Sequence, residues 1–391
     1  TVRAAHKTLL ASLPDLAVRL VLSAVVRLAR TAALNFVSGS FSAANAGLLA
    51  LSQSCRTPDQ TLYRADAPPA HLRMMRQPRR MAGLATVFSR DFCMYDIAVL
   101  TDGRYVAPDD NDWYIRQIHQ EDGLVADALR RQGLSVVRRD WANPDVDWSD
   151  CRALLFRTTW DYFDRFAEFS PWLEQVSGQC RLFNEAALIR WNIDKHYLGD
   201  LAAAGVNITP TWFIEPGDAR TLAEHVAACG WPELILKPAV SGAARHTYRF
   251  AAGDAGQHQA VFAELIAVEA MLLQPFQQSV LEQGEISLMV MDGRVSHAIR
   301  KTPKANDFRV QDDHGGTVHA HEASAEEIAF AEAAVAAAPF DVIYARVDVI
   351  RDNAGQLAIM ELEMVEPELF FRFHPAAADQ LAAGIARRLA A

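Results

Sequence analysis

The most unusual stretch of the sequence is "IMELEMVEP", residues 359–367, which sets Glu361, Glu363 and Glu366 among apolar neighbours. Burying a carboxylate costs free energy unless a cation or a hydrogen bond compensates for the lost water. Such a segment therefore indicates either a solvent-facing strand or a site where the carboxylates have a specific partner.

The preceding segment "ARVDVI" supplies a partner strand, and "DNAG" between the two predicts the turn of a hairpin. We expect Asp348 opposite Ile359 and Arg346 opposite Glu361. Because side chains alternate along a strand, Arg346, Asp348, Glu361 and Glu363 would then share one face. Such an oxygen-rich cluster suits Mg²⁺. The alternative is a solvated face on which Arg346 neutralises one glutamate.

Lysine is scarce from residue 94 onward, where four lysines stand against 22 arginines: Lys195, Lys237, Lys301 and Lys304. A retained lysine suggests a need for its compact ammonium, which is a common point-charge binder of phosphate. Lys195 is expected early on a helix. Lys237 ends a predicted strand before the small-residue loop "AVSGAARHT", an arrangement that can clamp phosphate. The alternative for each lysine is a solvated surface cation.

Composition narrows the class of protein. A chain of 391 residues predicts two or three domains, and half of the residues are apolar. A net charge of −10 argues against nucleic-acid binding. Five scattered cysteines without metal-ligand spacing favour a reducing, cytoplasmic location.

Residues 1–93 have a different composition, with twelve basic residues, four aspartates and no glutamate. We expect residues 1–93 to be an upstream extension of a folded part that begins at Met94, as an over-called start would produce. A helical appendage is one alternative. A membrane or targeting segment is another, because the 25 residues 31–55 carry no charge; we expect no membrane association.

Periodicity predicts an α/β fold. Strand, helix and strand alternate between residues 95 and 160, which indicates a parallel sheet with covering helices. Later segments predict a strand end and then a helix within residues 181–206, closed at Gly205. They also predict a hairpin turning at Asp292-Gly293 and the hairpin described above. The C-terminal part is therefore expected to be α+β.

The order of these motifs resembles the ATP-grasp superfamily, in its glutathione synthetase-like and ribosomal-protein glutamate ligase-like branch. The resemblance covers residues 94–391 and rests on "IRWNIDKHYL", "LILKPAVSG", "MLLQPF", "GEIS", "AIRK…DFRVQ" and "RVDV…MELEMVEP". A narrower similarity, to the cycloserine-forming ligases, rests on "RTTWDYF" and "MELEMVEPELFF". The resemblance implies four divisions: an extension (1–93), a parallel-sheet pre-ATP-grasp domain (94–186), a small lid subdomain (187–275) and a large subdomain (276–391).

The resemblance also implies roles for individual residues. ATP would be held by Lys195, Lys237, Ser241, Gln274, Pro275, Phe276 and Glu285. One or two Mg²⁺ ions, with Mn²⁺ as a substitute, would be held by Asp348, Glu361 and Glu363. Arg309 and Arg346 would stabilise the transferring phosphoryl group. Arg300 and Glu366 are expected to contact the substrate. The polar and aromatic "RTTWDYF" ends a predicted strand, where open α/β sheets bind ligands, so substrate contacts are also expected from Arg157, Thr158, Trp160 and Asp161. The alternative for these four is an ordinary strand end packed by Trp160.

The sequence departs from the family pattern at three places. Glu363 stands where many members have asparagine, Gln311 also replaces an asparagine, and Ala243-Ala244 occupy positions where glycine is common. The last difference puts the flexibility of the phosphate loop in question.

The implied reaction is formation of an amide-type bond between a carboxylate and an amine through an acyl-phosphate, with release of ADP and phosphate. The expected partners are small, amino-acid-like substrates, and a homo-oligomer is left open. Two alternatives are an ATP-dependent phosphotransferase and a non-catalytic nucleotide-binding protein.

Overall fold

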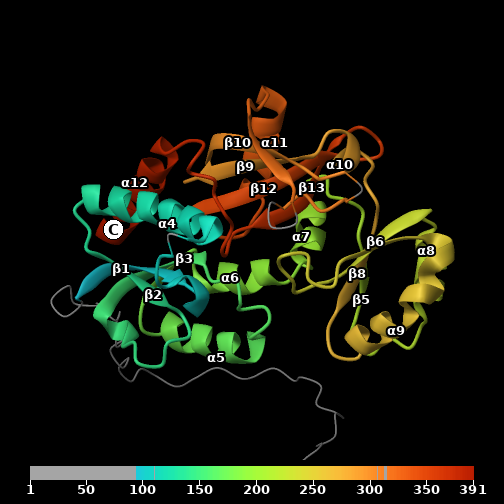
Figure 1. The fold of residues 1–391 in the computed structure, drawn as a ribbon, viewed down its shortest axis with the longest axis horizontal. Helices are drawn as coiled ribbons and strands as arrows, with labels where there is room; N and C mark the ends of the chain where they lie inside the picture. Colours follow the sequence, from blue (N-terminus) through green and yellow to red (C-terminus); the bar gives the residue numbers. More distant parts are fainter. Residues whose placement is uncertain (1–93, 110, 306, 312–314) are drawn as a thin grey trace, which may run out of the picture. The chain divides into compact units, whose positions relative to one another are not determined.

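The computed structural model describes residues 94–109, 111–305, 307–311 and 315–391 (Figure 1). The expectations for residues 1–93, including the uncharged stretch, lie outside this range. Among the helices of the described residues, none is both long enough and apolar enough to cross a membrane.

The first described part is a four-stranded parallel sheet of order β2-β1-β3-β4. Its strands are β1 (Tyr95–Thr101), β2 (Val136–Asp140), β3 (Cys151–Thr158) and β4 (Arg181–Phe183). Helices α4 (Trp113–Arg131) and α12 (Ala376–Ala390) contribute to the core on one face, and α5 (Phe166–Ser177) to the core on the other (Figure 1). The predicted parallel sheet with covering helices is confirmed.

Apolar side chains on both faces of β1 explain this layering. Ile97 and Val99 pack with α4 and α12, whereas Ala98 and Leu100 pack with α5. A continuous apolar run is typical of a strand covered on both faces. Helix α4 begins at Trp113, where the Asp112 carboxylate caps backbone N–H groups of the first turn.

The second sheet is antiparallel, with the order β11-β10-β9-β12-β13. Its strands are β9 (Glu285–Met291), β10 (Arg294–Thr302), β11 (Thr317–His321), β12 (Tyr344–Arg351) and β13 (Leu357–Glu363). Helix α11 (Ala325–Ala336) packs against one face, and α10 (Ser279–Glu282) precedes β9. The two predicted hairpins are confirmed, and Asp292 and Gly293 at the first turn both have positive φ, 52° and 79°.

The third sheet is also antiparallel and has the order β5-β8-β6-β7. It comprises β5 (Trp212–Ile214), β6 (Glu233–Pro238), β7 (Tyr248–Ala251) and β8 (Met271–Pro275). Helices α8 (Leu222–Cys229) and α9 (Ala255–Ile266) supply the rest of its core (Figure 1). The domain boundaries proposed from the sequence stay a prediction.

The prediction of a single helix that carries Lys195 is wrong, because the chain forms two helices there. These are α6 (Ala186–Ile193) and α7 (Tyr197–Ala203). Lys195 lies in the break between them, where its backbone N–H donates to the Ala239 carbonyl instead of to a helix carbonyl. This bond fixes Lys195 beside the end of β6.

Asn184 connects the parallel sheet to the β12–β13 hairpin of the second sheet. Its side-chain NH₂ donates to the carbonyls of Tyr344 (3.0 Å) and Met364 (2.8 Å), and its carbonyl accepts from the Ile343 N–H (2.7 Å). The residue is buried, so these backbone groups have no access to water as a substitute partner.

We expect Asn184→Ala to lower the free energy of unfolding by at least about 3 kcal/mol, because it leaves three buried backbone groups without a partner. Urea unfolding followed by tryptophan fluorescence measures this. Asn143→Ala is the matched control, because the exposed Asn143 side chain accepts one turn hydrogen bond from Asp145. Equal stability losses for the two variants would contradict the role given to Asn184.

Candidate active site

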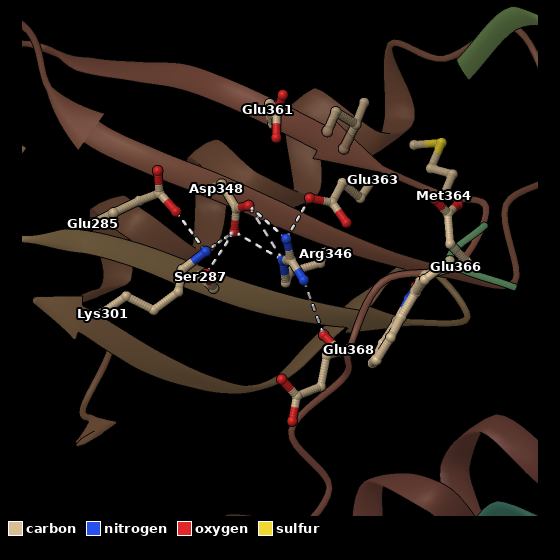
Figure 2. A network of polar contacts seen from close by, with 12 residues as sticks. Glu285, Ser287, Lys301, Arg346, Asp348, Glu361, Glu363, Met364, Glu366 and Glu368 are labelled. Carbon is tan, nitrogen blue, oxygen red and sulfur yellow. Dashed lines mark hydrogen bonds and ion pairs between the residues drawn. The ribbon is translucent and has the colours of Figure 1, made fainter. Parts of the chain in front are cut away.

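The predicted carboxylate hairpin exists, but its register differs from the expected one. Asp348 pairs with Glu361, and Arg346 pairs with Glu363. The expectation of Asp348 opposite Ile359 is wrong by two residues. The pairing beside the turn already differs by one residue, with Arg351 opposite Leu357, and an irregularity between Asp348 and Val349 adds a second. The shift leaves all four charged side chains together, as Figure 2 shows.

Asp348 lies at the centre of a buried network that extends over three strands (Figure 2). Arg346 Nη2 lies 3.0 Å from Asp348 Oδ2, and the Ser287 hydroxyl donates to Asp348 Oδ1 at 2.5 Å. Lys301 Nζ lies 3.4 Å from Asp348 Oδ1 and 2.5 Å from Glu285 Oε1. Burial raises the pKa of Asp348, but Arg346 and Lys301 outweigh it and leave the pKa below its ordinary value.

Glu361 is shared by the two lysines that the sequence singled out. Glu361 Oε1 lies 3.3 Å from Lys195 Nζ and 3.4 Å from Lys237 Nζ. Lys195 also donates to the Ser241 carbonyl at 2.6 Å. Burial acts to raise the pKa of Glu361, yet the two lysines hold it well below its usual range. Three distant segments therefore meet at one carboxylate.

The donor set of the hairpin fits a hard divalent cation. Asp348, Glu361 and Glu363 each offer a carboxylate oxygen, and these oxygens lie within 4.8 Å of one another. Burial raises the pKa of Glu363 to about 7, and the neighbouring carboxylates Asp348 and Glu361 add to that rise although Arg346 opposes it. Close carboxylates that repel one another in this way gain from a shared cation.

A cavity of about 400 Å³ joins this face to the other two sheets. Most of the predicted site residues line it: Lys195, Lys237, Ser241, Gln274, Pro275, Phe276, Glu285, Arg309, Arg346, Glu361, Glu363, Trp160 and Glu366. Asp348 lies beneath the lining, with 2% of its surface exposed. The structure thus brings the expected nucleotide, metal and phosphoryl-transfer residues to one place.

The phosphate loop after Lys237 adopts the backbone conformation that glycine favours although it holds alanines. Ala243 and Ala244 have φ values of 48° and 55°. The Arg245 guanidinium forms a two-point contact with Glu269 at 2.9 Å and lies 3.6 Å from Asp164. At Gly242, an added Cβ would come within 2.6 Å of the Phe163 ring. Side-chain contacts at both ends therefore hold this loop in place.

Four predicted substrate residues do not line the cavity. Arg157 and Thr158 are buried within β3, and Asp161 accepts from Trp141 Nε1 and pairs with Arg165. Arg300 donates to the Gln283 carbonyl, on the strand face opposite to Lys301. Alternation along β10 explains this result, because neighbouring residues point to opposite faces. These placements give no support to direct substrate contacts from the four residues.

Sequence reasoning missed several cavity residues: Lys301, Arg104, Tyr105, Tyr114, Tyr162 and Glu368. Lys301 had a signal, since it is one of the four rare lysines and lies opposite Glu285 in the predicted hairpin. Glu368 follows the glutamate-rich stretch directly. The aromatic residues had no pattern that distinguished them from core residues.

The loop after β13 is fixed by hydrogen bonds to its backbone. Trp160 Nε1 donates to the Glu366 carbonyl (2.8 Å), Tyr344 to the Val365 carbonyl (2.6 Å) and His297 Nε2 to the Leu369 carbonyl (2.9 Å). These bonds leave the Glu366 side chain at the cavity wall. Burial raises its pKa to about 8, and Glu363 adds to this shift.

Glu121 of α4 holds the end of the same loop, because its Oε1 accepts from the Phe371 N–H at 3.0 Å. Burial raises the pKa of Glu121 to about 7; Glu368 adds to this rise, and Arg157 opposes it. The Arg157 guanidinium is fully buried and lies 4.0 Å from Glu121 and 3.8 Å from Asp122. We interpret Arg157 as a structural cation that stabilises these two carboxylates.

Comparison with known proteins agrees with this geometry. Residues 212–369 match the RimK-like ATP-grasp domain, and residues 97–184 match the N-terminal domain of D-cycloserine synthetase DcsG. The D-alanine–D-alanine ligase from Bacillus anthracis has the same fold, with a TM-score of 0.54 at 15% identity over 76% of this chain and 97% of that one. The chain therefore has the ATP-grasp fold, with a RimK-like ATP-grasp domain over residues 212–369.

A closer relationship follows from two further relatives. The cycloserine biosynthesis protein DcsG of Streptomyces lavendulae is 33% identical over 283 residues, which are 68% of this chain and 92% of that protein. The crystal structure of D-cycloserine synthetase DcsG superposes with a TM-score of 0.65 at 31% identity, over 75% of this chain and 99% of the other. The chain belongs to the DcsG family of ATP-grasp enzymes.

The raised pKa of Glu121 predicts a pH-dependent effect of Glu121→Gln on stability. When a carboxyl has a higher pKa in the folded than in the unfolded protein, the folded state binds its proton more tightly. The protein therefore becomes less stable as the pH rises from the unfolded-state pKa, near 4.5, to the folded-state pKa, about 7. Glutamine resembles the protonated acid. The stability of Glu121→Gln relative to wild type should therefore increase by up to about 3 kcal/mol between pH 4.5 and pH 8.

Urea unfolding at four pH values across this range measures the effect. Glu332→Gln on α11 serves as the control, because Glu332 pairs with an exposed arginine at the surface. A constant difference between Glu121→Gln and wild type at every pH would contradict the assignment.

Proposed function

We propose that this enzyme is an ATP- and Mg²⁺-dependent ligase that joins a carboxylate and an amine through an acyl-phosphate and releases ADP and phosphate. Its substrate is small and resembles an amino acid. The proposal rests chiefly on one observation: a single cavity joins the paired lysines and the carboxylate hairpin to Trp160 and Glu366.

The nucleotide is assigned to the side of the cavity formed by the third sheet. Lys195 and Lys237 would hold its phosphates, and both are placed to do so by their shared contact with Glu361. Pro275 and Phe276 would lie along the adenine with Gln274. The Gln274 side-chain NH₂ already donates a hydrogen bond to the Thr211 hydroxyl at 3.0 Å. Glu285 would take the ribose hydroxyls, in exchange for part of its contact with Lys301.

Phosphoryl transfer depends mainly on positioned positive charge. Arg346 and Arg309 line the cavity and would stabilise the charge that develops as the γ-phosphoryl group moves to the substrate carboxylate. Mg²⁺ held by Asp348, Glu361 and Glu363 would neutralise phosphate charge and polarise the phosphoryl oxygens. The amine then attacks the acyl carbon, and phosphate leaves.

The acyl-phosphate must be protected from water until the amine attacks. The third sheet and its helices would form the lid, with residues 274–276 as the hinge. Of these residues, Phe276 is fixed by its backbone N–H to the Glu233 carbonyl and by stacking of Arg249, 3.6 Å from its ring. A hinge anchored in this way would move the lid as one body.

The central test measures ADP and free phosphate with pooled small amino acids and amines. We expect both products to appear together, and only when a suitable carboxylate and amine function are present, on one molecule or on two. If an added acid leads to ADP formation without release of free phosphate, the enzyme would instead be a phosphotransferase. ATP turnover that is independent of every added acid would contradict the ligase proposal.

We expect Glu361→Gln to lower ADP formation at least about a hundredfold, because it removes a metal ligand and the anion that aligns Lys195 and Lys237. Steady-state kinetics under saturating ATP and Mg²⁺ measure the loss. Glu326→Gln is the control, because Glu326 is an exposed carboxylate paired with Arg351. Full turnover by a folded Glu361→Gln enzyme would refute the metal site.

A further inference from the structure

Three Asp-x-Arg segments of the chain form the same local structure, although only one of their arginines was assigned a role above. They are residues 102–104, 218–220 and 307–309. In each, Asp Oδ1 accepts from the arginine backbone N–H at 2.9–3.0 Å and from Nε at 3.1 Å. Asp Oδ2 accepts from Nη2 at 2.7, 2.6 and 2.8 Å. The aspartate thereby fixes the direction of the guanidinium.

Two of these fixed arginines line the cavity and the third does not. Arg104 reaches the cavity from the parallel sheet, and Arg309 reaches it from the segment after β10. Arg220 lies before α8, outside the cavity lining. The same device therefore presents positive charge to the cavity from two separate parts of the chain.

Arg104 is well placed to bind a ligand. Asp102 follows β1 directly and is fully buried, whereas 55% of the Arg104 side chain is exposed. The carboxyl ends of parallel strands are where open α/β sheets bind ligands. Among the described residues, Asp102 is the ion-pair partner of Arg104, and Nη1 makes no hydrogen bond to any of them.

The aromatic surroundings of Arg104 further restrict its motion. Its guanidinium lies 5.0 Å from the centre of the Tyr105 ring, and Tyr105 packs edge-on against Trp160 at 5.8 Å. An arginine held by a carboxylate and an aromatic ring loses less conformational freedom when it binds an anion. Its remaining N–H groups suit a planar anion such as a carboxylate.

The charge of the nearby wall favours a carboxylate over a phosphate. Trp160 donates to the Glu366 backbone, which places Glu366 close to the same aromatic residues, and Glu368 also lines the cavity. Burial keeps Glu366 largely protonated at neutral pH, with its pKa raised to about 8, so Glu368 supplies the negative charge, which repels a doubly charged phosphate more strongly than a singly charged carboxylate. The lysines assigned to phosphate, Lys195 and Lys237, meet instead at Glu361.

We propose that Arg104 is an anion-binding residue that holds a carboxylate group of the substrate, in a subsite formed with Tyr105 and Trp160. This proposal rests on the ligase function proposed above and adds the residue that recognises the acid. The subsite belongs to the parallel-sheet part of the chain and is separate from the lysines assigned to the nucleotide.

The test uses saturation-transfer NMR on the full chain with Mg²⁺ and a non-hydrolysable ATP analogue. The probes are D- and L-alanine and D- and L-serine, each compared with its carboxamide. We expect at least one acid to bind and its carboxamide to bind at least tenfold more weakly. Arg104→Gln should weaken the acid about tenfold to a hundredfold and leave its carboxamide and the nucleotide unchanged.

Arg220→Gln is the matched control, because it removes an arginine of identical local structure outside the cavity; we expect no change in any affinity. Arg104→Lys tests the planar contact, and a loss of affinity close to that of Arg104→Gln supports it. Thermal unfolding of each variant verifies that it is folded.

Four outcomes would overturn the proposal: equal binding of acids and carboxamides, unchanged acid binding by Arg104→Gln, no binding of any acid to wild type, or a loss confined to the nucleotide. The last would assign the anion to a phosphate. Failure of the wild-type chain to bind the ATP analogue would instead contradict the proposed function, so the two failures are distinguishable.

Discussion

The rest of the structure depends on one constraint: the carboxylates buried on the second sheet must each lie beside a cation. Four carboxylates, Glu285, Asp348, Glu361 and Glu363, meet four cations, Lys195, Lys237, Lys301 and Arg346. Leaving one such charge unpaired would cost several kcal/mol. The cations come from the second sheet, from β6 of the third sheet and from the break between α6 and α7, so the cluster can form only when these three parts are assembled. Nucleotide phosphates would disturb this balance unless a divalent cation entered with them.

A second constraint is the path of the chain after the hairpin. Residues 364–371 have little regular structure, yet side chains from β3, β10, β12 and α4 or their connections bind their backbone groups. Rigid surroundings therefore replace secondary structure in positioning Glu366 and Glu368. This explains why glutamates so close in sequence face different partners.

The sequence predicted the elements of the site better than their exact placement. Alternating side chains and the rare lysines indicated the hairpin, Lys195 and Lys237 as candidates, and the order of the motifs along the chain supplied their expected roles. The register was not predictable, because an irregularity beside Asp348 leaves no mark in composition. The helix break at Lys195 depends on the distant Ala239 carbonyl. An arginine at the end of a strand suggests a ligand-binding residue. In the structure, however, Arg157 is buried beside Glu121 and Asp122, and this tertiary packing was not predictable from the sequence.

The loop after Lys237 holds two alanines in a left-handed backbone conformation. Non-glycine residues with left-handed backbone torsions are disfavoured by about 1–2 kcal/mol each, so Ala243 and Ala244 would relax elsewhere if the loop were released. Arg245 opposes this by pairing with both Glu269, just before β8, and Asp164, after β3. These two ion pairs therefore make the left-handed conformation of Ala243 and Ala244 depend on two segments that are distant in sequence.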